Sequence, residues 1–467
     1  MPKPTKTVAA PAASEGSGAA PIKVGVYSYY VLAVLLLIYI VNFIDRTILS
    51  IVAQPMKEEL GLADWQLGVL SGIAFAVFYV VMGVPVARLA ERRNRVKIIS
   101  GLIVIWSIMT AVCGLAQNFT QILLARFGVG VGEGGCSPAS HSIIADYFPR
   151  KQRSFALSLY SMGIPAGALF GALIGGWTAQ HFGWRMAFMV VGLPGLLLAL
   201  LMLTIREPLR GRFDPVASTE APSLMDALKL LARKKTFVHI CIGATLATFA
   251  NYGISSFAVP YLLRGFDIKL AAASSGYGLV TGIAAVFGVA LGGWLVDRFG
   301  AKDRRWYTWI PAIGVALSTP LYILTFAQTS LVALASFVVL PAIIHYLYMG
   351  PTYGLTSNLV EPRMRATAAA ILLLFMNLFG LGFGPTVVGI LSDIFASNAY
   401  AGQFLTDCPG GIAPAGSAAP ALAACKLASF TGLKYGMYVA AAVYLWSAVH
   451  YFLAAKSVTA DLAVYDH

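Results

Sequence analysis

Charged residues are scarce in this chain. Lys, Arg, Asp and Glu make up 11% of its 467 residues, less than half of the roughly 25% found in soluble domains. Hydrophobic residues make up 58% and aromatic residues 12%, which is the opposite of a disordered composition. A water-soluble globule and a disordered chain are therefore both excluded.

Sequence motifs of catalysis and energy coupling are also missing. No glycine-rich phosphate loop, metal-ligand spacing or Ser/His/Asp arrangement lies outside the apolar segments. The sequence therefore gives no support for an enzyme, a bound metal or cofactor, or an ATP-driven pump. It also lacks a re-entrant filter segment, which disfavours an ion channel.

Long apolar segments fill most of the chain. A helix needs about 20 apolar residues to cross a hydrocarbon core of about 30 Å. Twelve segments meet this requirement, over residues 28–53, 65–87, 97–116, 121–147, 154–180, 184–205, 237–263, 272–297, 307–327, 331–358, 366–394 and 432–455. Residues 1–24 lack the pattern of a cleavable signal peptide, so we expect the first segment to remain in the mature protein. The predicted fold is an all-α membrane protein with twelve transmembrane helices.

Basic residues are distributed unevenly between alternate loops. The net charge is +13, and most of the 33 Lys and Arg residues fall on one side of a twelve-helix topology. The other side holds only Lys57, Arg185, Arg264, Lys269, Lys426 and Lys434. The positive-inside rule then predicts a multi-pass protein of the cell (inner) membrane with both termini in the cytoplasm. Orientation accounts for the basic excess, so we expect no nucleic acid partner.

The longest charged, proline-containing loop divides the segments six and six. The predicted organisation is a disordered cytoplasmic tail (1–27), an N-terminal half (28–206), a cytoplasmic linker (207–235), a C-terminal half (236–455) and a cytoplasmic tail (456–467). An extracytoplasmic loop, 396–431, contains Cys408 and Cys425. An oxidising exterior permits a disulfide between them, and the sequence leaves open whether it forms.

A short motif occurs once in each half. Residues 293–300 read Gly-Trp-Leu-Val-Asp-Arg-Phe-Gly, and residues 87–95 read Ala-Arg-Leu-Ala-Glu-Arg-Arg-Asn-Arg. The chain thereby resembles the major facilitator superfamily, whose signature after helix 2 is Gly-x-x-x-Asp-Arg-x-Gly-Arg-Arg/Lys. The second copy matches well, whereas the first has Ala87, Glu91 and Asn94 in place of Gly, Asp and Gly. The resemblance implies two pseudo-symmetric six-helix halves.

In that family the acid and the arginine of the motif latch the halves on the cytoplasmic side when the carrier faces outward. The resemblance therefore implies that Glu91 and Arg92 pair with groups such as Asp146 and the start of helix 11. The implied conformational gate comprises Glu91, Arg92, Arg95, Asp146, Asp297, Arg298 and Glu361. The alternative is a solvated charge cluster that only sets topology.

Small residues recur at four-residue spacing in two helices where the resemblance expects contact between the halves. Helix 2 carries Gly68 and Gly72, and helix 11 carries Gly380 and Gly384. Such stripes allow helices to approach closely in lipid. We therefore expect helices 2 and 11 to pack tightly.

Four charged residues lie inside predicted helices, where each costs about 3 kcal/mol on insertion scales. Helix 1 carries Asp45 and Arg46, with Asn42 close by, and helix 4 carries Arg126 and Glu133. Arg126 and Glu133 are nearly two turns apart, so they share one face about 10 Å apart. We predict that these five residues bind substrate and couple it to a proton, because protonating one acid would free an arginine to bind an anionic group. The alternative is a permanent ion pair between helices 1 and 4.

Three motifs are similar to the spinster branch of the superfamily. They are Asn-x-x-Asp-Arg at 42–46, Arg-x-Gly-x-Gly-x-Gly-Glu at 126–133 and Gly-Leu-Gly-Phe-Gly-Pro at 380–385. That branch is associated with the export of sphingolipids, including sphingosine-1-phosphate, and of lysolipids, and with proton coupling. The resemblance therefore implies an amphipathic lipid as substrate, carried by alternating access.

The polar residues of the C-terminal half fit such a substrate, although hydrogen bonding between helices is an alternative role for each. They are Asn251, Tyr252, Ser255, Ser256, His345, Tyr346, Tyr348 and Asn377. An ionic head at the charged residues and a tail along an apolar wall would match the asymmetry of the halves. The alternative function is a carrier of a small water-soluble organic anion, and a membrane sensor is a third class. We expect a monomer without a cofactor.

Overall fold

The computed structural model describes residues 25–213, 224–361 and 364–463. Most of the predicted N-terminal tail, part of the linker and the last four residues lie outside this range. Eleven described helical segments are long and apolar enough to cross a membrane. The remaining predicted segment, 121–147, is present as two shorter helices that meet at Gly134 and Gly135. The structure therefore has the twelve predicted segments in two halves.

The N-terminal half begins with a 35-residue helix and continues through shorter ones. These are α1 (Val26–Leu60), α2 (Asp64–Ser71), α3 (Ile73–Arg92), α4 (Arg95–Leu115), α5 (Phe119–Glu133), α6 (Cys136–Tyr147), α7 (Arg150–Ser161), α8 (Gly163–Phe170), the π-helix η1 (Gly171–Gly175), α9 (Gly176–Phe182), α10 (Trp184–Gly192) and α11 (Pro194–Met202). Breaks at Gly72 and Met162 divide single membrane segments into paired helices.

The C-terminal half follows the linker. The end of the linker forms α12 (Leu224–Arg233). The half itself contains α13 (Lys235–Gly265), α14 (Leu270–Gly300), α15 (Trp306–Ala327), α16 (Leu331–Ile344), η2 (His345–Tyr348), α17 (Met349–Asn358), α18 (Arg365–Phe375), the π-helix η4 (Met376–Leu381), α19 (Gly382–Ala399), α20 (Phe404–Asp407), η5 (Pro409–Gly411) and α21 (Ala419–Ala454), and α22 (Val458–Ala463) lies in the C-terminal tail.

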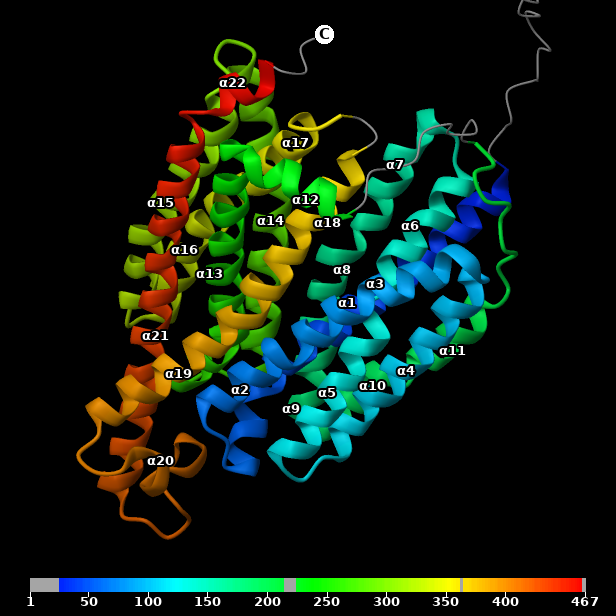
Figure 1. Cartoon of the computed structure of the whole chain (residues 1–467). Coiled ribbons are helices and arrows are strands. Elements are labelled where there is room, and N and C mark those ends of the chain that lie inside the picture. Colours follow the sequence, from blue (N-terminus) through cyan, green and yellow to red (C-terminus); the bar gives the residue numbers. More distant parts are fainter. Residues whose placement is uncertain (1–24, 214–223, 362–363, 464–467) are drawn as a thin grey trace, which may run out of the picture.

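The two ends of the molecule differ. We call the end with the start of α1 and with α22 the terminal end, and the opposite end, with residues 400–418, the disulfide end (Figure 1). Cys408 and Cys425 form a disulfide there. The irregular stretch is shorter than the predicted loop 396–431, because the alanine-rich residues from Ala419 onward extend α21.

The halves meet closely at the disulfide end and diverge toward the terminal end (Figure 1). Gly68 of α2 lies against the backbone of Pro385 of α19, and Gly72 lies against Gly382. A side chain at either α2 glycine would collide with that backbone, so these glycines permit the close approach of helices 2 and 11 that we predicted. One hydrophobic cluster, which includes Ile48 of α1 and Phe257 of α13, continues across this junction.

Candidate functional site

The charged residues predicted inside helices 1 and 4 come together in the N-terminal half. Asp45, Arg126 and Glu133 are each at most 2% exposed. Nε of Arg46 on α1 donates to Oε2 of Glu133 on α5 at 2.6 Å, forming an ion pair. We call Asn42, Asp45, Arg46, Arg126 and Glu133 the charged cluster.

The other two charges of the cluster are not ion-paired with each other. Thr110 of α4 donates its hydroxyl to the Asp45 carboxylate at 2.5–2.6 Å. Nε of Arg126 donates to the Leu70 carbonyl of α2 at 3.4 Å. Among the described residues, no ion pair joins Asp45 to either arginine. The predicted alternative of an ion pair between helices 1 and 4 is therefore present for Arg46 and Glu133 only.

Aromatic rings line the arginines of the cluster. The Arg46 guanidinium carbon lies 5.0 Å from the ring centre of Phe75 and 4.6 Å from that of Tyr79, both on α3. The Arg126 guanidinium carbon lies 5.3 Å from the ring centre of the same Phe75. Ring faces attract a cation without neutralising its charge, so both guanidinium groups can still bind an anion.

Among the described residues, three buried polar atoms of the cluster have no hydrogen-bond partner within normal distance and angle. They are Nδ2 of Asn42, Nη1 of Arg126 and Oε1 of Glu133. Leaving buried polar atoms unpaired costs about 1–3 kcal/mol each, and more for charged groups. They supply two donors and one acceptor for a ligand, a water molecule or a proton.

A pocket in the C-terminal half lies between α13, α14, α15 and α16, with a volume of about 230 Å³. Aliphatic and aromatic side chains dominate its lining, which includes Ile254, Val338 and Phe326. We call it the C-half pocket. His345 also lines it; its Nδ1 lies 3.0 Å from the Tyr322 hydroxyl, and its Nε2 has no partner.

Two adjacent residues of α13 connect this pocket to the N-terminal half. Asn251 lines the C-half pocket, whereas Tyr252 packs against the hydrophobic core of the N-terminal half that includes Phe75. The charged cluster and the apolar pocket are therefore neighbours across the junction of the halves.

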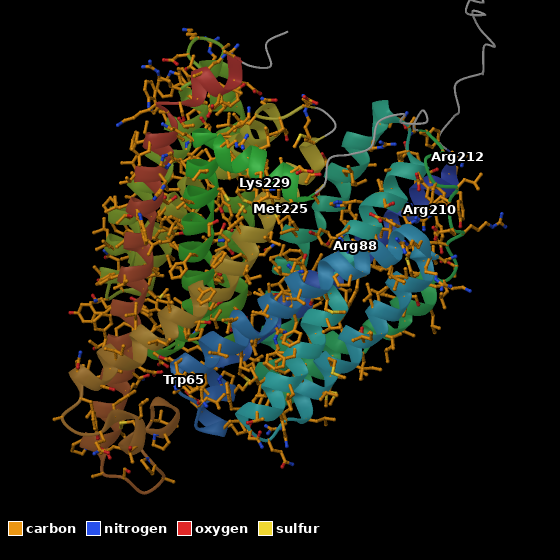
Figure 2. All side chains as sticks on the ribbon, in the orientation of Figure 1. Trp65, Arg88, Arg210, Arg212, Met225 and Lys229 are labelled. Atoms are coloured by element: carbon orange, nitrogen blue, oxygen red, sulfur yellow. A yellow bond between two sulfur atoms is a disulfide. The ribbon has the colours of Figure 1, made fainter. Side chains whose placement is uncertain are left out.

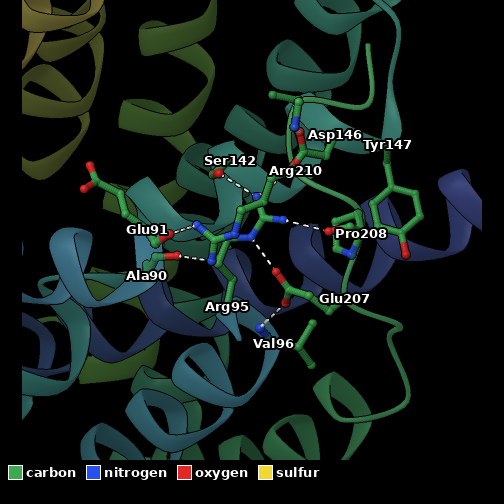
Figure 3. Close-up of polar contacts among 12 residues, drawn as sticks. Ala90, Glu91, Arg95, Val96, Ser142, Asp146, Tyr147, Glu207, Pro208 and Arg210 are labelled. Atoms are coloured by element: carbon green, nitrogen blue, oxygen red, sulfur yellow. Dashed lines mark hydrogen bonds and ion pairs between the residues drawn. The ribbon is translucent and has the colours of Figure 1, made fainter. Parts of the chain in front are cut away.

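At the terminal end, one predicted gate residue organises the polar contacts. Arg95 donates to Asp146 at 2.5 Å, to Glu207 at 2.7 Å and to Ser142 at 2.7 Å (Figure 3). Asp146 also accepts from the Gly211 backbone at 2.9 Å. In this structure Asp146 therefore pairs with Arg95, and all these residues belong to the N-terminal half and its linker. The pairing of Glu91 and Arg92 with Asp146 that the resemblance implies belongs to the outward-facing state and stays a prediction.

The other predicted gate residues lie toward the same end of the molecule. Glu91, Arg92, Asp297 and Arg298 are exposed. Glu361 is half-buried. Arg210 of the linker donates to the backbone carbonyl of Ala90 at 2.7 Å (Figure 3). It also donates to the backbone carbonyl of Arg93 at 2.6 Å and so closes the end of α3. Hydrogen bonds that join the halves are found toward the disulfide end.

A second set of buried charges ties the halves together at the disulfide end. Both oxygens of Asp64, at the start of α2, accept from Arg264 of α13 at 2.6 and 2.7 Å. Lys57 of α1 donates to Asp64 at 2.6 Å, and so does Ser392 of α19. Gln54 accepts from Nε of Arg264 at 2.8 Å.

Asp393 completes this set from α19. Its carboxylate accepts from the backbone nitrogens of Asp64 and Trp65 at 3.1 and 2.7 Å, so the C-terminal half caps α2. Figure 2 shows Trp65 where α2 meets α19. We call Gln54, Lys57, Asp64, Arg264, Ser392 and Asp393 the Asp64 network.

The Asp64 network was not predicted from the sequence, because Lys57 and Arg264 fall in predicted loops between apolar segments. In the structure both lie inside helices and are 1% and 6% exposed. Four charges at the ends of segments 1, 2, 7 and 11, with zero net charge, were the available signal. Within the described residues, no group of His, Cys, Asp or Glu has the arrangement of a metal site.

Comparisons with known proteins agree with this architecture. The sequence profile of the Major Facilitator Superfamily matches residues 35–385. An MFS-type efflux pump of Mycolicibacterium smegmatis is 34% identical over 363 residues, 77% of this chain and 83% of that protein. Protein spinster homolog 1 of Homo sapiens is 28% identical over 392 residues, 79% of this chain and 74% of that protein.

A solved structure shows the same fold. It is a bacterial homologue of the human lysosomal transporter spinster, in an inward-facing and unoccupied conformation. The two chains are 37% identical, with a TM-score of 0.87 over 93% of this chain and 98% of that one.

Proposed function

Because the chain belongs to the spinster branch of the major facilitator superfamily, we propose that it carries an amphipathic lipid across the membrane by proton-coupled alternating access. It is a transporter and not an enzyme. The substrate class is a sphingolipid such as sphingosine-1-phosphate, or a lysophospholipid. The carrier acts as a monomer without a cofactor, and the proton is its coupling ion.

The asymmetry between the halves is the observation that carries this proposal. The N-terminal half holds the charged cluster, with its unpaired atoms on Arg126 and Glu133. The C-terminal half holds a pocket dominated by aliphatic and aromatic side chains. An amphiphile would place its anionic head on the arginines, where charge-assisted hydrogen bonds are strongest, and its tail in the C-half pocket. A small water-soluble anion would instead require polar lining in both halves.

Proton coupling follows from the contacts of Glu133. Its Oε2 holds Arg46 at 2.6 Å, and its Oε1 has no partner. A proton on Glu133 would weaken the ion pair and release Arg46 for the substrate head. Proton binding and substrate binding would then influence each other by the same free energy.

The contacts and charges at the two ends of the molecule indicate which side of the membrane the open end faces. Buried contacts join the halves at the disulfide end, and the terminal end carries most of the basic residues. By the positive-inside rule the terminal end faces the cytoplasm, with both termini there and the chain in the cell (inner) membrane. The structure is then an inward-open state.

Reconstitution into liposomes tests the substrate class. We expect protein-dependent movement of lysophosphatidic acid, changed by an imposed pH gradient, and no movement of succinate. Movement of succinate alone would overturn the lipid proposal in favour of a small-anion carrier. Movement of lysophosphatidic acid at a rate independent of the gradient would overturn proton coupling and leave the lipid class standing.

Glu133→Gln tests the coupling residue. Glutamine keeps the shape of the side chain but binds no proton, so transport by this variant should lose its pH dependence. Asp267→Asn, at an exposed position in the C-terminal half, is the control carboxylate and should keep the wild-type pH profile. An unaltered pH profile for Glu133→Gln would remove Glu133 from the coupling mechanism.

A further inference from the structure

An open apolar groove lies at the surface of the C-terminal half, separate from the C-half pocket. It has a volume of about 390 Å³ and is lined by α12, α13 and the junction of α18 with η4. We call it the α12 groove. Its lining is Leu228, Ala232, Phe237, Val238, Cys241, Ile242, Thr245, Leu246, Phe375 and Phe379.

Helix α12 presents three different faces. Ala227 and Leu231 are fully buried against the bundle, and α12 contacts both α13 and α18. Leu228 and Ala232 point into the groove. Lys229 lies on the exposed side (Figure 2). Because residues four apart share a helix face, α12 covers one end of the groove with apolar side chains and turns its basic side chains outward.

The basic side chains lie beside the groove. Lys229 and Arg233 are one turn apart and both exposed. Lys234 and Lys235 continue the positive charge into the start of α13. Asp226 is the single acid of α12, so the segment keeps a net positive charge. Clusters of this kind next to a membrane helix attract anionic lipid head groups, at about 1 kcal/mol per basic residue.

The length of the groove matches one leaflet. Along α13 its lining extends from Phe237 to Leu246, which is about 14 Å at 1.5 Å per residue. One leaflet contributes about 15 Å of a 30 Å hydrocarbon core. The stacked rings of Phe375 and Phe379, 5.9 Å apart, form part of the opposite wall. This is the shape of a site for one extended acyl chain.

We propose that the α12 groove binds an anionic membrane phospholipid, with one acyl chain between α13 and α18 and the phosphate on Lys229 and Arg233. The groove and the transported substrate occupy different places, since none of the groove residues lines the C-half pocket. The proposal therefore does not depend on which substrate the transporter carries.

Native mass spectrometry of the purified full-length protein tests the site. The protein is exchanged into detergent with equal amounts of dioleoyl phosphatidylglycerol and dioleoyl phosphatidylcholine, which differ in charge and not in tail. We expect one phosphatidylglycerol to be retained in preference. Lys229→Glu with Arg233→Glu should lower its retention about tenfold or more. The matched control reverses Lys302 and Arg305, two exposed basic residues after α14, and should leave retention unchanged.

A second variant tests the acyl site. Ala232→Trp fills the groove from an exposed helix position and should lower the retention of both lipids, whereas Ala442→Trp, on the exposed side of α21, should not. Equal retention of the two lipids, or unchanged retention in the double charge reversal, would overturn the proposal. A wild-type dimer that is lost in Ala232→Trp would also overturn it, because the groove would then be an interface between two copies.

Discussion

The molecule contains two buried clusters with the same charges and different hydrogen bonding. In one, the acids accept hydrogen bonds from several donors; in the other, some polar atoms have no hydrogen-bond partner. The charged cluster and the Asp64 network each hold two acids and two bases. In the Asp64 network, Asp64 accepts from Arg264, Lys57 and Ser392, and Asp393 accepts from two backbone nitrogens. In the charged cluster, Arg126 and Glu133 keep atoms without partners.

This difference in hydrogen bonding distinguishes a network that holds helices in one arrangement from a site that binds a ligand or a proton. A buried ion pair with complete hydrogen bonding fixes one arrangement of its helices, and breaking it is costly. A cluster with unpaired atoms gains free energy when a ligand or a proton supplies the missing partner. The Asp64 network also joins the halves, whereas the charged cluster lies within one half. We therefore assign conformational control to the first and substrate and proton binding to the second.

The largest expected effect is that of Arg126→Ala. Arg126 has an unpaired Nη1 and one long hydrogen bond to a carbonyl, so the head of a substrate would be its main partner. Losing a buried charged contact costs about 2–5 kcal/mol, which corresponds to a fall of roughly 30-fold or more in substrate affinity. Binding of lysophosphatidic acid to the purified protein measures it.

Arg126→Lys is the matched control, because it keeps the charge and loses the bidentate fork. It should bind with intermediate affinity. Wild-type affinity in Arg126→Ala, in a variant that still unfolds at the wild-type temperature, would show that the charged cluster is a structural tie like the Asp64 network.

The next largest effect is that of Arg264→Gln, which should open the disulfide end. Removing one member of a buried ion pair costs about 3–5 kcal/mol, and this cost falls on the state in which the halves are joined there. The distance between spin labels at Gln117 and Lys269, exposed residues of the two halves, should shift to longer values. The labels are placed in a chain whose free cysteines, Cys113, Cys136 and Cys241, are replaced by serine.

Arg185→Gln is the matched control for this opening. Arg185 pairs with Glu59 at the same end, but both belong to the N-terminal half and are partly exposed. Exposed pairs contribute about 0–1 kcal/mol, so the distance should not change. An unchanged distance in Arg264→Gln as well would mean that helix packing alone closes this end.

The sequence predicted the charged cluster because a charge within an apolar segment is conspicuous. Asp45 and Arg46 are the only charged residues between Lys23 and Lys57, and Glu133 is the only one between Arg126 and Asp146. Lys57 and Arg264 lie near segment ends, where a charge is ordinarily solvated, and only the packing of α1 against α13 buries them. Long-range contacts of this kind leave no local pattern.

The fold was more predictable than the contacts. A helix must be long and apolar enough to cross the membrane, so segment length and hydropathy are enough to predict the twelve segments. Internal breaks were not predictable, because Gly134 and Gly135 within segment 4 also fit a continuous helix of small residues. The start of α21 was placed too late, since Ala, Pro and Gly between 411 and 424 are equally compatible with a loop.

A smaller effect is expected when the disulfide is removed. Cys408 and Cys425 close a loop of 17 residues, which stabilises a fold by about 3 kcal/mol. The loop covers the Asp64 network without belonging to it, since Gly410 lies against Lys57 and Glu58. Cys408→Ser with Cys425→Ser should therefore lower the unfolding temperature and leave the Gln117 to Lys269 distance unchanged. A longer distance would mean that the disulfide also holds the two halves together at this end.

The smallest effect, that of Ser392→Ala, tests the contrast between the clusters most finely. Ser392 donates to Oδ2 of Asp64 at 2.6 Å, and that oxygen also accepts from Arg264. Asp64 therefore keeps its other hydrogen bonds, and the loss should be about 0.5–1.5 kcal/mol of unfolding free energy.

Thr110→Val is the corresponding change in the charged cluster, where Thr110 is the hydrogen-bond donor to Asp45. Removing a donor from a buried carboxylate that has no second one costs more, so Thr110→Val should impair both stability and transport further than Ser392→Ala does. Equal effects of the two variants, measured by thermal unfolding and by transport in liposomes, would mean that another group already satisfies Asp45 and that the two clusters differ less than their hydrogen bonds indicate.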